Sequence, residues 1–335
     1  FSCEFQKRIP YHRRHIVNGS YDKTAAVVVL PPIRGGRLAD HSLRAWLAQS
    51  DLTQADEPQE LLATILKELG LPYPEQGLAA LRMWGQTGDR PTVWIAAADP
   101  VYLEPRLDHL CLHALQRTGI PPSDLRPLFD HLQETLADDQ RYGFARLGGC
   151  GYLRAESPIS TAMVPAYVID QREPGEFLPT GEHTVMHRNI LSEIEMSLHE
   201  HEVNVRRVEE GKAPVNSLWL WGGGMAPEKI TRPQPPLFTE DPLLLGYWES
   251  ATAVADLWPG NFAACAEASL HGFVAVTPEY DSSPEYLHQY LQELRELLRS
   301  DRVSRLILLF RDGLRADVRR SHTLKFWRRD SELLD

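Results

Sequence analysis

Five short runs of apolar residues, rich in β-branched and aromatic side chains, constrain the fold of this 335-residue chain more than any other feature. Each run ends near a proline, a glycine or an aspartate, and segments with helical periodicity lie between the runs. Such runs are typical of strands in a parallel sheet that helices cover on both faces. We therefore predict strands at residues 25–30, 92–97, 217–221, 272–276 and 305–310.

The alternation of strands and helices predicts an α/β fold with a mostly parallel central sheet flanked by helices and joined by right-handed crossovers. More than a hundred residues separate the second predicted strand from the third, which is too many for one crossover. We therefore predict a discontinuous α/β core at 21–99 and 214–335, an inserted subdomain at 100–213 and a basic N-terminal extension at 1–20.

Charge and cysteine content limit the binding partners and the cellular location that we expect for this chain. The chain has 35 basic and 46 acidic residues, and its net charge of −11 argues against general nucleic-acid binding. No apolar run is long enough for a membrane-spanning helix, so no membrane partner is expected. Cys3, Cys111, Cys150 and Cys265 are scattered, which is typical of reduced thiols in a cytoplasmic protein. The oligomeric state stays open.

A glycine triplet, Gly222, Gly223 and Gly224, follows the run at 217–221. Glycines after a parallel strand let the backbone approach a ligand closely and can turn N–H groups toward an anion. The triplet lacks the Gly-Lys-Ser/Thr of a P-loop and the spacing of a dinucleotide fingerprint. Two interpretations therefore stay open, an anion-binding loop and a tight turn at a crowded edge of the sheet.

Residues 199–229 contain, in order, an acidic helix end, an arginine pair, a turn with glycine and proline, an apolar strand and the glycine triplet. Over these roughly thirty residues the chain resembles the archaeal-type cofactor-independent phosphoglycerate mutases. A bacterial family of mutase-like or regulatory proteins is similar over most of the chain after residue 25. The resemblance implies a fold of the alkaline-phosphatase type. The matching positions are Asn204, Arg206, Arg207, Gly211, Pro214, Asn216, Gly222, Gly224 and Pro227.

The chain departs from these mutases where their metals bind. The resemblance implies two divalent metals, held by aspartates and histidines after the core strands, and a serine nucleophile. Here the first strand leads to Arg34 without an Asp-Gly motif, and the last leads to Arg311 and Asp312 without a histidine. We therefore predict a degenerate active site with no resident metal or other cofactor. Mn or Zn is expected only if the ligands have relocated, with Asp312 as one candidate, although a lone carboxylate is a poor divalent site.

Ser42 is the candidate nucleophile, since it begins a predicted helix within Asp40-His41-Ser42. The same spacing is typical of an aspartate that caps the helix, so the catalytic residue stays unknown.

Histidines at 183–201 suggest another site. His183 and His187 are four residues apart, as are Glu195 and His199, and such pairs on one helix face can hold zinc. The glutamates in the same predicted helix, at 182–208, favour a solvated surface instead.

Arginines near the strand ends suggest an anion pocket, because guanidinium groups bind phosphate and carboxylate in two-pronged fashion. Alternatively, each arginine pairs with a surface carboxylate, which this acidic chain has in excess. The candidate ligand-binding residues are Arg34, Asn204, Arg206, Arg207, Asn216, Gly222, Gly223, Gly224 and Arg311.

Three functions fit this sequence. The favoured one is a phosphoglycerate-mutase-like protein that has lost its metals and binds a small anionic, phosphorylated metabolite or a protein partner. The alternatives are an active metal-dependent mutase or phosphatase and a purely structural or interaction protein. The missing aspartate and histidine ligands favour the first over the second, and the arginines and glycine triplet favour it over the third.

Overall fold

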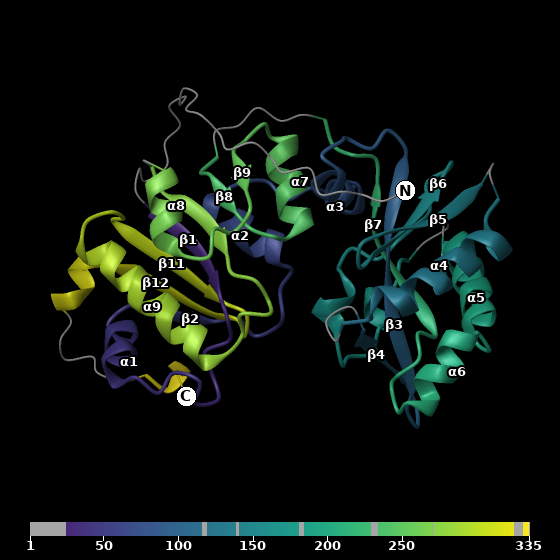
Figure 1. Cartoon of the computed structure of the whole chain (residues 1–335), viewed down its shortest axis with the longest axis horizontal. Coiled ribbons are helices and arrows are strands. Elements are labelled where there is room, and N and C mark those ends of the chain that lie inside the picture. Colours follow the sequence, from purple (N-terminus) through teal and green to yellow (C-terminus); the bar gives the residue numbers. More distant parts are fainter. Residues whose placement is uncertain are drawn as a thin grey trace.

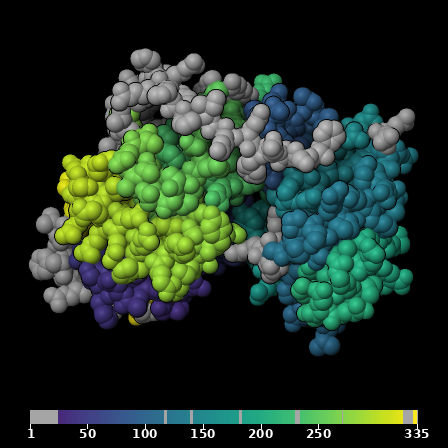
Figure 2. Space-filling model, in the orientation of Figure 1, coloured from purple at the N-terminus to yellow at the C-terminus, as the bar shows by residue number. Residues whose placement is uncertain are grey.

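The computed structural model describes residues 25–115, 119–138, 141–180, 184–228, 234–269, 271–324 and 331–334. Within these residues the chain forms two sheets that occupy separate halves of the molecule (Figure 1). Figure 2 shows these halves as two lobes, one coloured purple, green and yellow and the other blue to teal. The predicted extension at 1–20 lies outside the described residues.

The larger sheet is mostly parallel and runs in the order β2-β12-β11-β1-β10-β8-β9. β1 lies inside the sheet between β10 and β11, parallel to both, while β12 runs antiparallel to β11 and to β2. The strands are β1 (Ala25–Leu30), β2 (Asp51–Gln54), β8 (Leu237–Phe238), β9 (Ala255–Asp256), β10 (Phe273–Val276), β11 (Arg305–Phe310) and β12 (Leu314–Arg319). All five predicted strands form, and three of them, at 25–30, 272–276 and 305–310, lie in this sheet as predicted.

Helices cover both faces of this sheet, which explains the continuous apolar runs. Val27 and Val29 of β1 pack into one core, and Ala26, Val28 and Leu30 pack into another on the opposite face. The predicted α/β class is thereby confirmed. The first face is covered by α2 (Leu61–Leu69), α3 (Leu78–Thr87) and α7 (Pro242–Ser250), and the second by α1 (His41–Ala48), α8 (Phe262–Ala268) and α9 (Pro284–Arg299).

The smaller sheet is antiparallel, and its helices lie on the side away from the larger sheet (Figure 1). It runs in the order β4-β3-β6-β5, and β7 also pairs with β3. Its strands are β3 (Trp94–Pro105), β4 (Leu110–Ala114), β5 (Tyr142–Leu147), β6 (Cys150–Ala155) and β7 (Ser217–Gly224). Its helices are α4 (Pro122–Leu136), α5 (Thr184–Leu198) and α6 (Glu202–Glu209).

Two predicted strands of the parallel core, at 92–97 and 217–221, belong instead to this smaller sheet as β3 and β7. The sequence pattern placed them in the wrong sheet because both strands are buried on both faces. Ile95 and Ala97 of β3 pack into the core shared with the larger sheet, whereas Trp94 and Ala96 pack against the outer helices. A doubly buried antiparallel strand has the same apolar pattern as a parallel one. Residues 94–99 and 217–224, which the sequence assigned to the core, therefore pair with the inserted strands.

The single helix predicted at 182–208 is two helices. α5 ends at Leu198, and His201 begins α6 by accepting a hydrogen bond from the backbone N–H of Val203 at Nδ1 (3.2 Å). A side-chain acceptor before the first turn satisfies an N–H group that the helix itself cannot. This interruption shifts the directions in which the histidines of the segment point.

α3 joins the two halves. On one side Gly85 of α3 and Gly246 of α7 let the helices approach until a Cβ at either position would overlap a backbone carbonyl. On the other side the buried Arg82 pairs with Asp99 of β3 at 2.7 Å, and Trp221 of β7 donates to the second oxygen of Asp99 at 2.6 Å. Among the described helices, none combines the length and apolar character needed to cross a membrane.

Candidate functional site

The carboxyl ends of the parallel strands form one edge of the larger sheet, and polar side chains gather in the loops that follow them. These loops come after β1, β8, β10 and β11, and also after β2, which runs in the same direction. Open α/β sheets bind their ligands at this edge. We refer to it as the carboxyl edge, and it is the candidate functional site.

Asp312, in the turn after β11, holds the loop after β1. Its Oδ2 accepts hydrogen bonds from the backbone N–H groups of Ile33 (2.7 Å) and Arg34 (2.8 Å). Its Oδ1 is buried and has no hydrogen-bond partner among the described residues. The structure thus places Arg34 beside the turn that carries Arg311, as the sequence predicted for these two arginines.

Two further arginine side chains tie the loops of this edge together. Arg311 donates from Nη2 to the carbonyl oxygen of Thr277 (2.7 Å) and lies 3.3 Å from Glu279. Arg37 donates to the carbonyl oxygen of Ser282 (2.8 Å). Arg34 is exposed and forms no ion pair with another described residue. Its guanidinium group is therefore open to a ligand from solvent, whereas that of Arg37 already donates one hydrogen bond to Ser282.

The acidic side chains of the edge cap helices. Asp40, Glu60 and Asp241 precede α1, α2 and α7, and each accepts hydrogen bonds from two backbone N–H groups of the first helical turn at 2.7–3.0 Å. These caps satisfy N–H groups that the helices leave unpaired and place negative charge at the positive end of the helix dipole. At least one oxygen of each carboxylate is therefore used by the fold itself.

Burial changes the protonation of two of these acids. It raises the pKa of Glu60 to about 7, although the backbone N–H groups of Leu62 and Ala63 oppose the shift. Burial also raises the pKa of Asp241, and the charge of Asp241 in turn raises that of Glu60. A carboxyl group that retains its proton near neutral pH, as this pKa implies for Glu60, is a poor ligand for a divalent metal, because metal binding requires the ionised form.

Ser42, the candidate nucleophile, lies in the first turn of α1. Asp40 caps this helix, as the alternative interpretation of the sequence predicted. The Ser42 hydroxyl accepts a hydrogen bond from Arg295 at 2.8 Å, and the imidazole of His288 lies 3.8 Å from the carboxylate of Asp40. Among the described contacts, none provides Ser42 with a general base, so its catalytic role stays a prediction.

Arg206 and Arg207 do not reach the carboxyl edge. Both belong to α6, beside the smaller sheet, and both pair with Asp124 of α4, at 2.8 and 2.9 Å. The sequence placed them before a core strand, but that strand is β7 of the smaller sheet. Together the two arginines hold the pKa of Asp124 below its usual value. The predicted convergence with Arg34 and Arg311 is therefore corrected, and the alternative, pairing with carboxylates, is what the structure shows.

Asn204 and Asn216 bind backbone groups near the start of β7. Asn204 donates to the carbonyl oxygens of Leu198 and Val215 and accepts from the Val215 N–H group, each at 2.8 Å. Asn216 accepts from the N–H group of Leu103 (2.7 Å) and donates to its carbonyl oxygen (2.9 Å). These side chains fix the turn before β7 and its position beside β3.

The glycine triplet forms the end of β7 and not a loop after a parallel strand. The N–H groups of Gly222 and Gly223 donate to the Ala162 carbonyl (2.8 Å) and the Thr161 hydroxyl (2.9 Å). A Cβ at Gly222 or Gly224 would crowd the start of α3, and both have positive φ. The triplet therefore permits close packing of α3, the second of the two interpretations that the sequence left open.

The predicted histidine site is dispersed. His183 lies outside the described residues. His187 is buried in α5, where burial lowers the pKa of its imidazole, and His199 is exposed beyond the end of that helix. Neither these histidines nor Asp312 belongs to a metal-competent group of three side chains among the described residues.

Comparisons with known proteins point to one enzyme class. Residues of this chain are 38% identical over 68 positions to the 2,3-bisphosphoglycerate-independent phosphoglycerate mutase of Methanosarcina barkeri, covering 20% of this chain and 17% of that protein. They are 30% identical over 131 positions to a probable mutase of the same name from Geobacter sulfurreducens, covering 38% and 32%. Part of the chain is thus related to cofactor-independent phosphoglycerate mutases. The chain spans only 17% to 32% of the length of these curated relatives.

Solved structures give weaker similarity. The cofactor-independent phosphoglycerate mutase of Thermoplasma acidophilum aligns over 88% of this chain and 89% of its own, with 18% identity and a TM-score of 0.39. A protein of Pyrococcus horikoshii aligns over 87% and 82%, with 15% identity and a TM-score of 0.47. No family model matches the chain.

One group of side chains was missed by the sequence analysis. Glu104 of β3 and Cys111 and His113 of β4 bring potential metal-ligating atoms within 4.8 Å of one another. The sequence signal for this group is the Cys-x-His spacing of Cys111 and His113, on β4, which follows β3 after a short turn. If a β-hairpin is assumed at this turn, Glu104 is expected to lie opposite Cys111. We refer to these three residues as the hairpin cluster.

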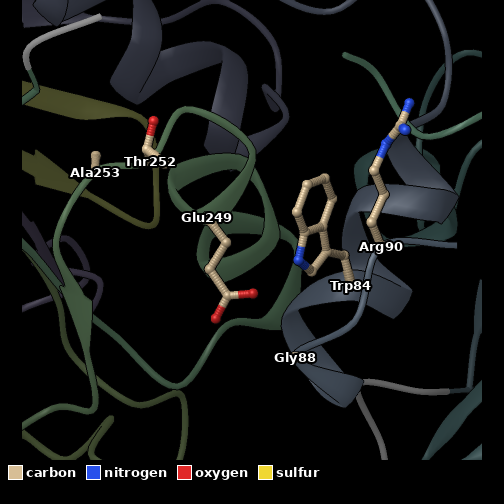
Figure 3. A pocket seen from close by; sticks show the side chains of 6 residues that line it. All are labelled: Trp84, Gly88, Arg90, Glu249, Thr252 and Ala253. Atoms are coloured by element: carbon tan, nitrogen blue, oxygen red, sulfur yellow. The ribbon is translucent and has the colours of Figure 1, made fainter. Parts of the chain in front are cut away.

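The two cavities described in the structure both lie away from the carboxyl edge. One, of about 600 Å³, opens between the C-terminal ends of α3 and α7, and Figure 3 shows Trp84 and Glu249 on either side of it. It is at the opposite end of α7 from Asp241. The second, of about 510 Å³, adjoins the hairpin cluster.

Proposed function

We propose that this chain is a phosphomutase-related binding protein that holds a small phosphorylated anion at the carboxyl edge and does not convert it. The relation of part of the chain to cofactor-independent phosphoglycerate mutases supports the class of ligand. The proposal that the chain does not convert this anion depends on the side chains at the carboxyl edge.

One observation carries the proposal. Four acidic side chains at the edge, those of Asp40, Glu60, Asp241 and Asp312, accept hydrogen bonds from backbone N–H groups, so at least one oxygen of each carboxylate already serves the fold. Phosphoryl transfer on two metals requires several ionised ligands around each ion. Asp312 has one buried oxygen without a partner, but a single carboxylate does not make such a site.

Arg34 is the residue that we expect to bind the anion. Its backbone is held by Asp312 while its guanidinium group is exposed, and Arg37 and Arg311 keep the surrounding loops in place. A fixed backbone reduces the entropy lost when the side chain is ordered by a ligand. Guanidinium and phosphate groups pair through two parallel hydrogen bonds. The scattered cysteines and a metabolite ligand fit a cytoplasmic location, which is part of the proposal.

Titration calorimetry with inorganic phosphate and 3-phosphoglycerate tests the binding. We expect Arg34→Ala to weaken binding about 10-fold or more, the usual effect of losing a charge-assisted pair. Arg206→Ala is the matched control, because this arginine belongs to the same predicted set but pairs with Asp124. Equal affinity of wild type and Arg34→Ala would refute the proposed pocket.

The enzymatic alternative has its own assay. Wild type supplemented with Mn²⁺ or Zn²⁺ is expected not to interconvert 2- and 3-phosphoglycerate. Sustained turnover that Ser42→Ala abolishes would show an active mutase with relocated ligands and would overturn the non-catalytic part of the proposal. Binding of neither anion would leave the interaction-protein hypothesis as the better account.

A further inference from the structure

The hairpin cluster is built by the register of two antiparallel strands. Glu104 of β3 lies directly opposite Cys111 of β4, and Tyr102 lies opposite His113. Directly opposed residues point to the same face of a sheet, as do residues two apart on one strand. The side chains of Glu104, Cys111 and His113 therefore share one face. It is the face away from Leu112, which packs into the core between the two sheets.

Glu104 and Cys111 each have a ligating atom that accepts no hydrogen bond from a described residue. Oε2 of Glu104 contacts Nε2 of His113 (2.8 Å) and Arg106 (2.7 Å), while its Oε1 forms no hydrogen bond with a described residue. Cys111 is a free thiol, 7% exposed.

The imidazole of His113 is held in place on two sides. The ring of Tyr102 stacks on it with centroids 5.7 Å apart and an interplanar angle of 25°. Glu104 contacts its Nε2. An imidazole that neighbours orient in this way loses little freedom when it binds a metal.

We propose that Glu104, Cys111 and His113 form a zinc site with three protein ligands. Zinc accepts this combination of sulfur, nitrogen and oxygen donors at about 2.0–2.3 Å, in tetrahedral geometry. Ligating atoms that already lie within 4.8 Å of one another need only small side-chain rotations to reach such distances. Binding ionises the Cys111 thiol and releases its proton to solvent, and the hydrogen bond between Glu104 and His113 is exchanged for two bonds to the metal.

The fourth coordination position is open. Glu104 and His113 line the cavity of about 510 Å³, together with Arg207 and Lys212. A zinc ion with three protein ligands keeps a water or an exogenous ligand in the fourth position. The site lies beside the smaller sheet and is independent of the anion site proposed at Arg34.

A purely structural account of the cluster leaves one residue unexplained. Glu104, His113 and Arg106 could serve only as cross-strand charge pairs on an exposed surface, which stabilise a sheet weakly. That account gives no role to a cysteine directly opposite Glu104 with its sulfur within 4.8 Å of both other donors. A serine or threonine at 111 would serve a charge pair equally well, whereas a thiol adds the donor that zinc binds most strongly.

Metal titration of the full chain tests the site. After treatment with a chelator, the protein is expected to bind one Zn²⁺ per chain, measured by elemental analysis and by competition with a chromophoric chelator. Co²⁺ in its place is expected to give a thiolate-to-cobalt charge-transfer band. Loss of an outer-shell partner alone weakens metal sites about 10- to 100-fold, so Cys111→Ser and His113→Gln are expected to weaken binding by roughly 100-fold or more.

Matched controls separate this site from others. His109→Gln alters an exposed histidine on the same hairpin, and Cys265→Ser alters a buried cysteine in the other half, so both are expected to bind zinc as wild type does. Absence of stoichiometric binding, or a cobalt complex without the thiolate band, overturns the proposal. It is equally overturned if Cys111→Ser binds as tightly as wild type, or if His187→Gln or His199→Gln removes the metal instead.

Discussion

The carboxyl edge and the hairpin cluster are both rich in charged side chains, but their charges are used differently. At the edge, Asp40, Glu60, Asp241 and Asp312 all accept hydrogen bonds from backbone N–H groups. In the hairpin cluster, Cys111 contacts no backbone group through its sulfur in the described contacts, and Glu104 contacts only other side chains. A polar residue at the expected end of a strand can therefore be part of the scaffold, while a ligand site arises elsewhere.

The largest difference between the two regions is expected in the pH dependence of stability. Burial raises the pKa of Glu60 from its usual 4.5 to about 7, so the folded state retains this proton to higher pH than the unfolded state. The contribution of Glu60 to stability is fully present below pH 4.5 and is lost as the pH rises through 7. The loss is on the order of 3 kcal/mol. Unfolding by urea at a series of pH values measures it.

Glu60→Gln is the variant that isolates this effect. It cannot ionise, so relative to wild type it is expected to become more stable between pH 5 and 8. Glu57→Gln, in the same loop but exposed, is the control and is expected to follow wild type. Parallel pH profiles for wild type and Glu60→Gln would contradict the prediction, because they would show that folding leaves the pKa of Glu60 unchanged.

A smaller effect is expected from Asp312. Asp312→Ala removes the acceptor of two backbone N–H groups and is expected to lower the free energy of unfolding by about 2 kcal/mol, as for hydrogen bonds to a charged group. Because the loop carrying Arg34 is then no longer held, phosphate binding should weaken too. Asp130→Ala is the control, since this exposed aspartate in α4 pairs with Arg126 on the surface. A loss no larger than that of Asp130→Ala would mean that Asp312 does not hold the loop.

Asp40 and Ser42 separate capping from catalysis within one helix turn. Asp40→Ala is expected to cost about 1 kcal/mol of stability, the usual effect of losing an N-cap. Ser42→Ala is expected to stay within about 0.5 kcal/mol of wild type, because the exposed hydroxyl contacts only Arg295. Thermal and urea unfolding compare the two. Equal losses would show that the serine contributes to the cap as much as the aspartate does.

The sequence predicted the central strands of the parallel sheet because β1, β10 and β11 are apolar along their whole length and helices cover both faces. It also predicted that Arg34 and Arg311 would lie at one edge, since strand ends of a parallel sheet coincide. It could not assign β3 and β7 to their sheet, because Ile95 and Trp94 are buried on opposite faces there as well. Strand direction depends on pairing between distant segments, which burial patterns do not record.

The site residues were harder to predict for a related reason. Arg206 and Arg207 looked like anion ligands because they precede a strand, but their partner Asp124 lies more than eighty residues earlier. Glu104 and Cys111 looked unrelated because only a hairpin brings them together. Residue type and spacing indicate what chemistry a side chain can perform, whereas the register of the strands decides whether partners meet.

The smallest effect is expected in the hairpin cluster when no metal is present. Glu104→Gln, measured in a chelator, should change the free energy of unfolding by less than about 0.5 kcal/mol, because its contacts are side-chain pairs that solvent weakens. Wild type and variant should differ once zinc is added. At a free Zn²⁺ concentration of about 100 times the dissociation constant, mass action stabilises wild type by about 2.7 kcal/mol, and the variant should gain far less. Melting temperatures with and without Zn²⁺ measure both quantities. A large loss in the chelator, with no further difference in zinc, would place Glu104 with the carboxylates of the carboxyl edge, as a part of the scaffold.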